Sequence, residues 1–167
     1  MLGTNSERLP PLTGGKDEDF MREALAEALC AWREDEVPVG AVVVRGDEII
    51  ARGHNTRERE QDPLGHAEIK AISEASGAIG SWRLEECTLY VTLEPCLMCA
   101  GAIVNSRIPR VIWGANDPKG GACVSLYEVL TDSRLNHRCE VEGGIYGELA
   151  GSWLTEYFSL KRGKSPK

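Results

Sequence analysis

Two short segments, thirty residues apart, restrict how this chain can fold. His66-Ala67-Glu68 supplies an imidazole and a carboxylate, and Pro95-Cys96-Leu97-Met98-Cys99 supplies two thiols. An imidazole and two thiolates form a ligand set that suits zinc and argues against magnesium or calcium. A catalytic zinc site has three protein ligands, whereas a structural site has four, so this set leaves one position open. We therefore expect a fold that brings the two segments together.

Both segments are expected near the start of a helix. Cys96 and Cys99 are three residues apart, so on a helix their thiols lie on the same side, and a first turn favours thiolate. Pro95 suits that first turn because it needs no hydrogen-bond donor there. Glu68 would point about 200° away from His66 on a regular helix. We therefore predict that His66 lies at the irregular start of its helix, where Glu68 can reach water on the metal and move its protons.

Each segment has a less specific interpretation. A lone Cys-x-x-Cys also occurs in redox sites and zinc knuckles, and Glu68 taken alone would be an ordinary surface glutamate. A zinc-stabilised binding module without catalysis is a further alternative, but it leaves Glu68 and the open ligand position without a use. The other two histidines, His54 and His137, are expected to be hydrogen-bonding residues and not metal ligands.

Length and composition indicate one globular domain. The chain has 167 residues, of which 42% are hydrophobic and 27% are charged, as in ordinary soluble proteins. No apolar run approaches the roughly 18 residues that a membrane span requires. Residues 1–8 lack the apolar core of a secretory signal. A cytoplasmic protein is therefore expected, with no membrane partner.

The remaining cysteines do not show metal-ligand spacing. In a chain of this size without an export signal, metal binding explains cysteine better than disulfides do. Free cysteine is usually a small buried apolar residue, and that interpretation is expected for Cys30, Cys87, Cys123 and Cys139.

The net charge of −7 is unevenly distributed. Residues 17–36 hold eight acids and two arginines, so this one segment carries −6. Residues 157–167 hold four basic residues and no acid. An RNA partner is therefore not excluded, although no long basic stripe indicates one. The basic end also fits a solvated helix terminus whose charge suits the helix dipole.

Apolar periodicity and turn signals predict a single α/β domain with a five-stranded sheet and helices on both faces. The first two strands should form a hairpin around Gly46-Asp47. The last helix is expected to bury Leu149, Trp153, Tyr157 and Leu160, and Trp82 and Trp113 are expected in the core. The helices should begin near residues 17, 66, 96 and 145 and end near 36, 76, 103 and 162, and the strands should cover 40–45, 48–52, 88–92, 110–114 and 139–141.

Residues 1–16 mix prolines, glycines and polar residues, and they are expected to form a flexible N-terminal arm. The folded domain should cover residues 17–162, and residues 163–167 should form a basic C-terminal tail. Neither an internal repeat nor a low-complexity segment divides the domain further.

Beyond the two motifs, the chain resembles bacterial-type tRNA adenosine deaminases from about residue 20 to residue 162. The H-x-E…P-C-x-x-C pattern is typical of zinc-dependent base deaminases in general, and guanine and cytosine deaminases share the middle block. The last two of the matching blocks are specifically similar to the tRNA enzyme. The blocks are EVPVGAV (36–42), HAEI (66–69), LYVTLEPCLMCAGA (89–102), SRI (106–108), GANDPKGGA (114–122) and LNHR (135–138).

The resemblance implies a three-layer α/β/α cytidine deaminase-like fold with a central five-stranded mixed sheet. It also implies hydrolytic deamination of adenosine to inosine at the wobble position of a tRNA anticodon, by a homodimer with one zinc ion per subunit. The anticodon stem-loop would be the partner. A free guanine or cytosine deaminase of the same fold is the main alternative, and the acidic net charge mildly favours it.

The resemblance also implies the roles of individual residues. The family's zinc ligands match His66, Cys96 and Cys99, and its proton carrier matches Glu68. Asp117 matches an acidic residue that lies near the RNA strand in the family. The role implied for it is contact with a ribose 2′-hydroxyl, which an acid can make beside RNA. The other substrate contacts implied are Asn55 at the base, Ala67 and Leu93 in the pocket wall, and Val37 and Pro38 at its rim. Asn116 departs from the family pattern, which often has a basic residue there.

Overall fold

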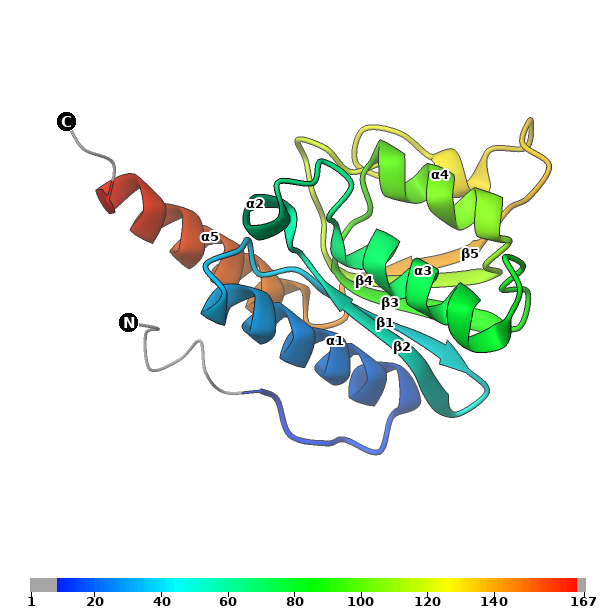
Figure 1. Cartoon of the computed structure of the whole chain (residues 1–167), viewed down its shortest axis with the longest axis horizontal. Coiled ribbons are helices and arrows are strands. Elements are labelled where there is room, and N and C mark those ends of the chain that lie inside the picture. The colour runs from blue at the N-terminus through cyan, green and yellow to red at the C-terminus, as the bar shows by residue number, and fades with distance from the viewer. Residues whose placement is uncertain (1–8, 165–167) are drawn as a thin grey trace.

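A five-stranded mixed sheet forms the middle layer of the protein. The structure is a computed structural model, and it describes residues 9–164. The strands lie in the order β2-β1-β3-β4-β5, with β1 antiparallel to both neighbours and β3, β4 and β5 parallel (Figure 1). The expected hairpin and five-stranded sheet are therefore confirmed. The strands are β1 (Gly40–Arg45), β2 (Glu48–His54), β3 (Cys87–Leu93), β4 (Arg110–Ala115) and β5 (Glu140–Gly143).

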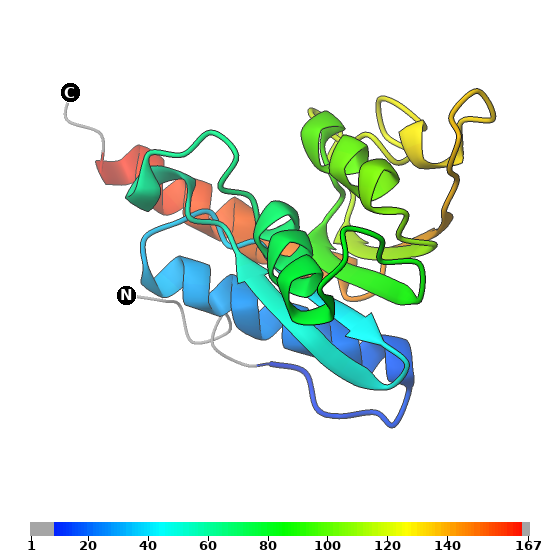
Figure 2. The same cartoon turned by 45° about the vertical axis from the view of Figure 1, so that its right-hand side comes forward.

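Helices cover both faces of the sheet. Figure 2 shows α3 and α4 on one face, and α1 with α5 on the other. The result is a three-layer α/β/α fold of the cytidine deaminase-like class, as expected. The helices are α1 (Lys16–Arg33), α2 (Arg57–Glu60), α3 (Ala67–Ile79), α4 (Leu97–Ser106) and α5 (Gly147–Lys164), and a 3-10 turn, η1, covers Val129–Thr131.

Strand β1 shows why the central strands are apolar without interruption: their side chains are buried on both faces of the sheet. Side chains alternate between the two faces of a strand, and both faces of this sheet are covered. Val42 and Val44 belong to a core cluster with Met21 of α1, whereas Val43 belongs to the core cluster that includes Ala71 of α3. The three valines therefore alternate between the helix layer that contains α1 and the layer that contains α3.

Two glycines let helices lie directly on the hairpin. A Cβ atom on Gly40 would lie 2.1 Å from the carbonyl oxygen of Ala24 in α1. A Cβ atom on Gly53 would lie 2.5 Å from the carbonyl oxygen of Ala67, the first residue of α3. The absent side chain of Gly53 thus sets how closely the start of α3 approaches the sheet.

Several local expectations were wrong. Trp82 is 58% exposed, with the Arg83 guanidinium 4.6 Å from its ring centroid, and Leu160 is 42% exposed on α5. Helix α4 begins at Leu97, so Cys96 is its N-cap residue and Pro95 lies outside the helix. The four-residue helix α2 lies where no helix was expected.

The limits of the folded domain, residues 17 and 162, stay a prediction. The domain was expected to begin at residue 17, and α1 begins at Lys16. Residues 1–8 of the predicted arm and 165–167 of the predicted tail lie outside the described residues. Between residues 9 and 164, none of the helices has the length and apolarity to cross a membrane.

The contact at Gly53 predicts a defined loss of stability. Gly53→Ala should lower the free energy of unfolding by about 1–3 kcal/mol, because the new methyl group overlaps the backbone of α3. Gly77→Ala is the matched control, since Gly77 lies within α3 and has open space around it. It should raise the free energy by about 0.5–1 kcal/mol through helix propensity. Urea unfolding of both variants measures the difference, and equal effects would contradict the packing argument.

Candidate metal centre and active site

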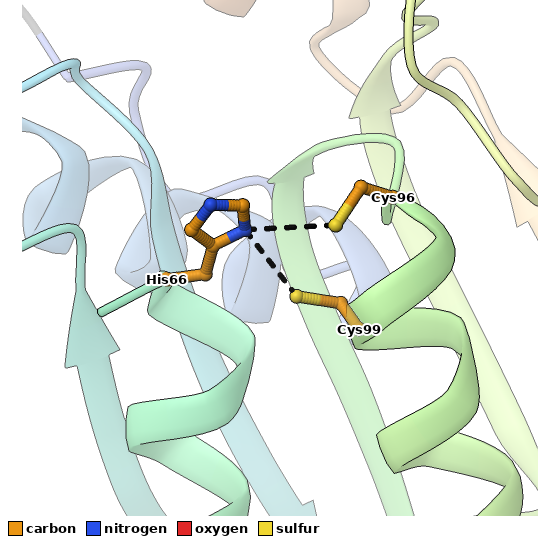
Figure 3. Close-up of side chains that lie close together, drawn as sticks. All are labelled: His66, Cys96 and Cys99. Carbon is orange, nitrogen blue, oxygen red and sulfur yellow. Dashed lines mark hydrogen bonds between the residues drawn. The ribbon is translucent and has the colours of Figure 1, made fainter. Parts of the chain in front are cut away.

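Three potential metal ligands meet at the starts of α3 and α4 (Figure 3). His66 Nδ1 lies 3.6 Å from Cys96 Sγ and 3.5 Å from Cys99 Sγ. Ligand atoms that each lie about 2.0–2.3 Å from a tetrahedral zinc ion are separated by about 3.3–3.8 Å. The spacing of the side chains therefore fits a metal site. Within residues 9–164, this is the one such group of histidine, cysteine and acidic side chains.

Helix boundaries place these ligands. His66 is the N-cap residue of α3, with an extended backbone (φ −86°, ψ 151°), so it lies at the irregular helix start as predicted. Cys96 is likewise the extended N-cap residue of α4 (φ −76°, ψ 178°), and Cys99 follows in the first turn, fully buried. Two helix N-termini, each with a positive dipole end, therefore face the same point.

The site favours thiolate even before a cation is considered. A hydrogen bond from the Cys99 thiol, together with one from His66, lowers the pKa of Cys96 to about 4. The same bond with Cys96, together with burial, raises the pKa of Cys99. One thiolate and one thiol are thus held side by side, and a bound cation would favour ionisation of both.

Glu68 lies in the first turn of α3 and is only 4% exposed. Burial raises the pKa of its carboxyl group, against the opposing effects of a hydrogen bond with Cys99 and the charge of His66. A carboxyl group in such surroundings is suited to accept and return a proton near neutral pH.

A cavity of about 190 Å³ opens beside these residues. Every predicted substrate contact except Pro38 lines this cavity. Pro38 is buried and does not line the cavity, whereas its neighbour Val39 does. The cavity is lined by Val37, Val39, Asn55, Arg57, His66, Ala67, Glu68, Leu93, Glu94, Cys96, Asp117 and Phe158.

Asn55 is held between two walls of this cavity. It directly follows β2 and is 7% exposed. Its Oδ1 accepts a hydrogen bond from the Arg57 backbone N–H at 3.0 Å, and its Nδ2 donates to the Val37 carbonyl oxygen at 3.5 Å. Its own backbone N–H donates to the Val39 carbonyl oxygen. The amide is therefore fixed in orientation at the cavity wall.

Four lining residues were not predicted, namely Val39, Arg57, Glu94 and Phe158. Phe158 is 45% exposed on α5, and an exposed aromatic side chain is a sign of a binding surface. Glu94 is a charged residue at the end of a buried strand, which is an equally unusual position.

The other histidines and cysteines lie apart from the ligand group. His137 Nε2 contacts the Ile108 carbonyl oxygen, so its expected hydrogen-bonding role is confirmed. All six cysteines are free, and Cys87, Cys123 and Cys139 are buried as expected, whereas Cys30 is half-buried.

His54 joins the end of β2 to α1. Its Nδ1 lies 3.1 Å from Glu27 and its Nε2 lies 3.1 Å from Glu34. Arg52 contacts Glu27, and Arg59 contacts Glu34, so the two acids also face arginines. The hydrogen bond with Glu27 raises the pKa of His54, assisted by Glu34 and opposed by burial.

The sequence and the fold both match known deaminases. Residues 16–155 match the MafB19-like deaminase family. The tRNA-specific adenosine deaminase of Bacillus subtilis is 52% identical over 149 residues, which cover 89% of this chain and 92% of that protein. The chain belongs to the tRNA-specific adenosine deaminase family. It is therefore a deaminase.

Solved structures of two kinds of deaminase superpose on this chain. A structure from a study of A-to-I editing by tRNA:A34 deaminases superposes with a TM-score of 0.78 at 43% identity, covering 81% of this chain and 99% of that one. A guanine deaminase from Bacillus subtilis superposes with a TM-score of 0.57 at 38% identity, covering 59% of this chain and 64% of that one. The tRNA:A34 deaminase structure thus covers more of this chain, at higher identity, than this guanine deaminase does.

The His54 contacts predict how stability depends on pH. Because the folded-state pKa of His54 is raised, its contribution to stability is fully present below the ordinary histidine value of about 6.5 and is lost as the pH rises through the folded-state value. The free energy of unfolding of the wild type should therefore exceed that of His54→Gln most at pH 5–6, and the difference should shrink toward pH 9. A difference that does not change with pH would contradict this assignment.

Proposed function

We propose that the protein is a zinc-dependent hydrolase that converts adenosine to inosine at the wobble position of a tRNA anticodon. One observation carries the proposal. His66, Cys96 and a buried Glu68 line one cavity, and the third potential ligand, Cys99, lies 3.5 Å from His66 Nδ1, in a chain 52% identical to a tRNA-specific adenosine deaminase. We propose His66, Cys96 and Cys99 as the metal ligands and Glu68 as the catalytic residue.

The donor set supports zinc as the cofactor, one ion per chain. One imidazole and two thiolates form a borderline-soft set that suits zinc and does not suit magnesium or calcium. When bound, zinc supplies the positive charge that makes water a nucleophile at neutral pH. Three protein ligands leave the position that this chemistry requires.

Glu68 carries the protons in the proposed reaction. Water and adenosine give inosine and ammonia, so one proton must reach the purine ring and another must reach the leaving nitrogen. Glu68 is buried beside the ligands, and a carboxyl group with a raised pKa can carry both protons of the water in turn. It passes the first to the ring nitrogen and the second, from the newly added hydroxyl group, to the leaving nitrogen.

The remaining walls of the cavity suit a single flipped base. We propose that the fixed amide of Asn55 binds the base edge, and that Ala67 and Leu93 contact the ring faces. Val37, which lines the cavity, is proposed to form its rim. A base in an anticodon loop is already outside a duplex, so moving it into a cavity requires less unstacking.

A neighbouring groove supports an RNA strand as the substrate. This groove, of about 660 Å³, shares Leu93, Asp117 and Phe158 with the cavity and is also lined by Lys119 and Arg162. Its two cations can face phosphates although the whole chain is acidic. We propose that Asp117 contacts a ribose hydroxyl there.

We propose that the enzyme works as a homodimer in the cytoplasm. Four large apolar side chains are 45–52% exposed near the metal centre, a degree of exposure that suits contact with a second copy. They are Leu97 at the start of α4, and Val124, Leu126 and Tyr127 in the segment that follows Gly121, which is itself bridged to Cys96.

Glu68→Ala tests the proton carrier. The variant should keep one zinc ion per chain and lose about 10²–10⁴-fold in kcat, because general acid–base catalysis contributes about that factor. Inosine formation in an anticodon stem-loop measures turnover, and free guanine and cytosine are tested beside it. Conversion of guanine by the wild type, with the RNA left unchanged, would overturn the proposed substrate. Loss of zinc from Glu68→Ala would overturn the proposed role.

Cys96→Ala tests the ligand set. The variant should lose zinc and melt at a lower temperature, because metal binding contributes to folding. Cys87→Ala is the control, since Cys87 is a buried cysteine at the start of β3 and lies outside the ligand group. It should keep its zinc. Zinc content by atomic absorption and thermal unfolding check both variants, and an active, metal-replete Cys96→Ala would refute the site.

A further inference from the structure

Glu94 is a buried carboxylate that faces a loop. It follows β3 directly, one residue before Pro95, and is 2% exposed. Its carboxylate accepts hydrogen bonds from four backbone N–H groups and one hydroxyl. Oε1 accepts the N–H groups of Cys123 (3.1 Å), Val124 (2.8 Å) and Ser125 (2.9 Å), and Oε2 accepts the Asp117 N–H (2.9 Å) and the Ser125 hydroxyl.

The segment that supplies these donors, here called the 117–125 loop, is also joined to the metal side. Gly121 forms an isolated bridge with Cys96, and the Ala122 N–H donates to the Pro95 carbonyl oxygen at 2.8 Å. A Cβ atom on Gly121 would lie 2.3 Å from the Glu94 carboxylate, so only glycine fits there. The loop is thus closed tightly around one anion.

The hydrogen bonds of Glu94 suit an ionised carboxylate. All five contacts come from N–H or O–H groups, and an ionised carboxylate is the form of this side chain that only accepts hydrogen bonds. Hydrogen bonds to an ionised group are stronger than bonds between neutral groups. The loop is therefore held by an anion that its own backbone stabilises.

We propose that Glu94 is a positioning residue that fixes the 117–125 loop and thereby places Asp117 at the mouth of the cavity. Asp117 lines the cavity, and its backbone N–H is one of the five donors to Glu94. Both carboxylate oxygens are occupied by loop donors, so Glu94 acts on the substrate through the loop. This role rests on the proposed RNA substrate, because Asp117 is the proposed contact to the strand.

Glu94→Gln is the decisive variant. An amide has one acceptor oxygen, and its NH₂ group would face N–H donors, so part of the loop must be released. The KM for an anticodon stem-loop should rise about tenfold or more, because bonds to a charged group are lost. The kcat should stay within about threefold, since Glu68 and the ligands keep their places. Zinc should remain at one per chain, and the amide protons of the loop should exchange faster.

Glu74→Gln is the matched control. Glu74 is an exposed residue of α3 that also accepts a backbone hydrogen bond, from Arg52 at 3.0 Å, but it does not line the cavity. The same change of charge there should leave KM within about twofold of the wild type. Equal increases in KM at the two positions would attribute the effect to charge alone and overturn the proposal.

Ser125→Ala gives a second test that keeps the carboxylate. It removes one of the five donors, so KM should rise in the same direction but less, with zinc retained. If Glu94→Gln does not fold, this variant decides, and a wild-type KM with wild-type amide exchange would refute the role. Faster loop exchange with an unchanged KM in Glu94→Gln, or loss of zinc, would also refute it. Failure of the wild type to act on RNA would instead refute the proposed function.

Discussion

The site depends on the convergence of two helix N-termini at one edge of the sheet. Strands β2 and β3 are both antiparallel to β1, so they run in the same direction and end at the same edge. Helix α3 follows β2 through the short α2 segment, and α4 follows β3. The first residues of the two helices therefore meet beyond the strand ends, as at many ligand sites of α/β proteins. This topology brings His66 to Cys96 and Cys99 across thirty residues of chain.

Three buried carboxylates, those of Glu36, Glu68 and Glu94, lie in different environments, so they are suited to different roles. Glu94 accepts backbone N–H groups of the 117–125 loop, and Glu36 accepts those of Glu58 and Arg59 in α2, so each holds a neighbouring segment in place. Glu68 is surrounded by the ligand side chains, and burial raises its pKa, whereas the pKa of Glu94 is lowered. The same residue type therefore serves as a structural anion at one position and is suited to proton transfer at another.

Sequence patterns predicted the sheet well because its strands are apolar or alternate regularly, as in β1 and its hairpin partner. They failed where local preference and tertiary contact disagree. The four polar residues of α2 show no helical periodicity, and the buried Glu36 carboxylate orders this segment by accepting the N–H groups of Glu58 and Arg59. Trp82 is apolar enough for a core but lies just beyond the end of α3, where it stacks with Arg83 at the surface.

The residues alone predict the chemistry, because ligand type, ligand number and a neighbouring carboxylate do not depend on the fold. They also predict that His66 lies at a helix start, since Glu68 could not otherwise reach water on the metal. Which other side chains share the cavity follows from contacts between distant parts of the chain. Phe158 comes from the last helix, and the 117–125 loop is folded around Glu94. Such contacts join residues far apart in the chain, and no local periodicity or spacing records them.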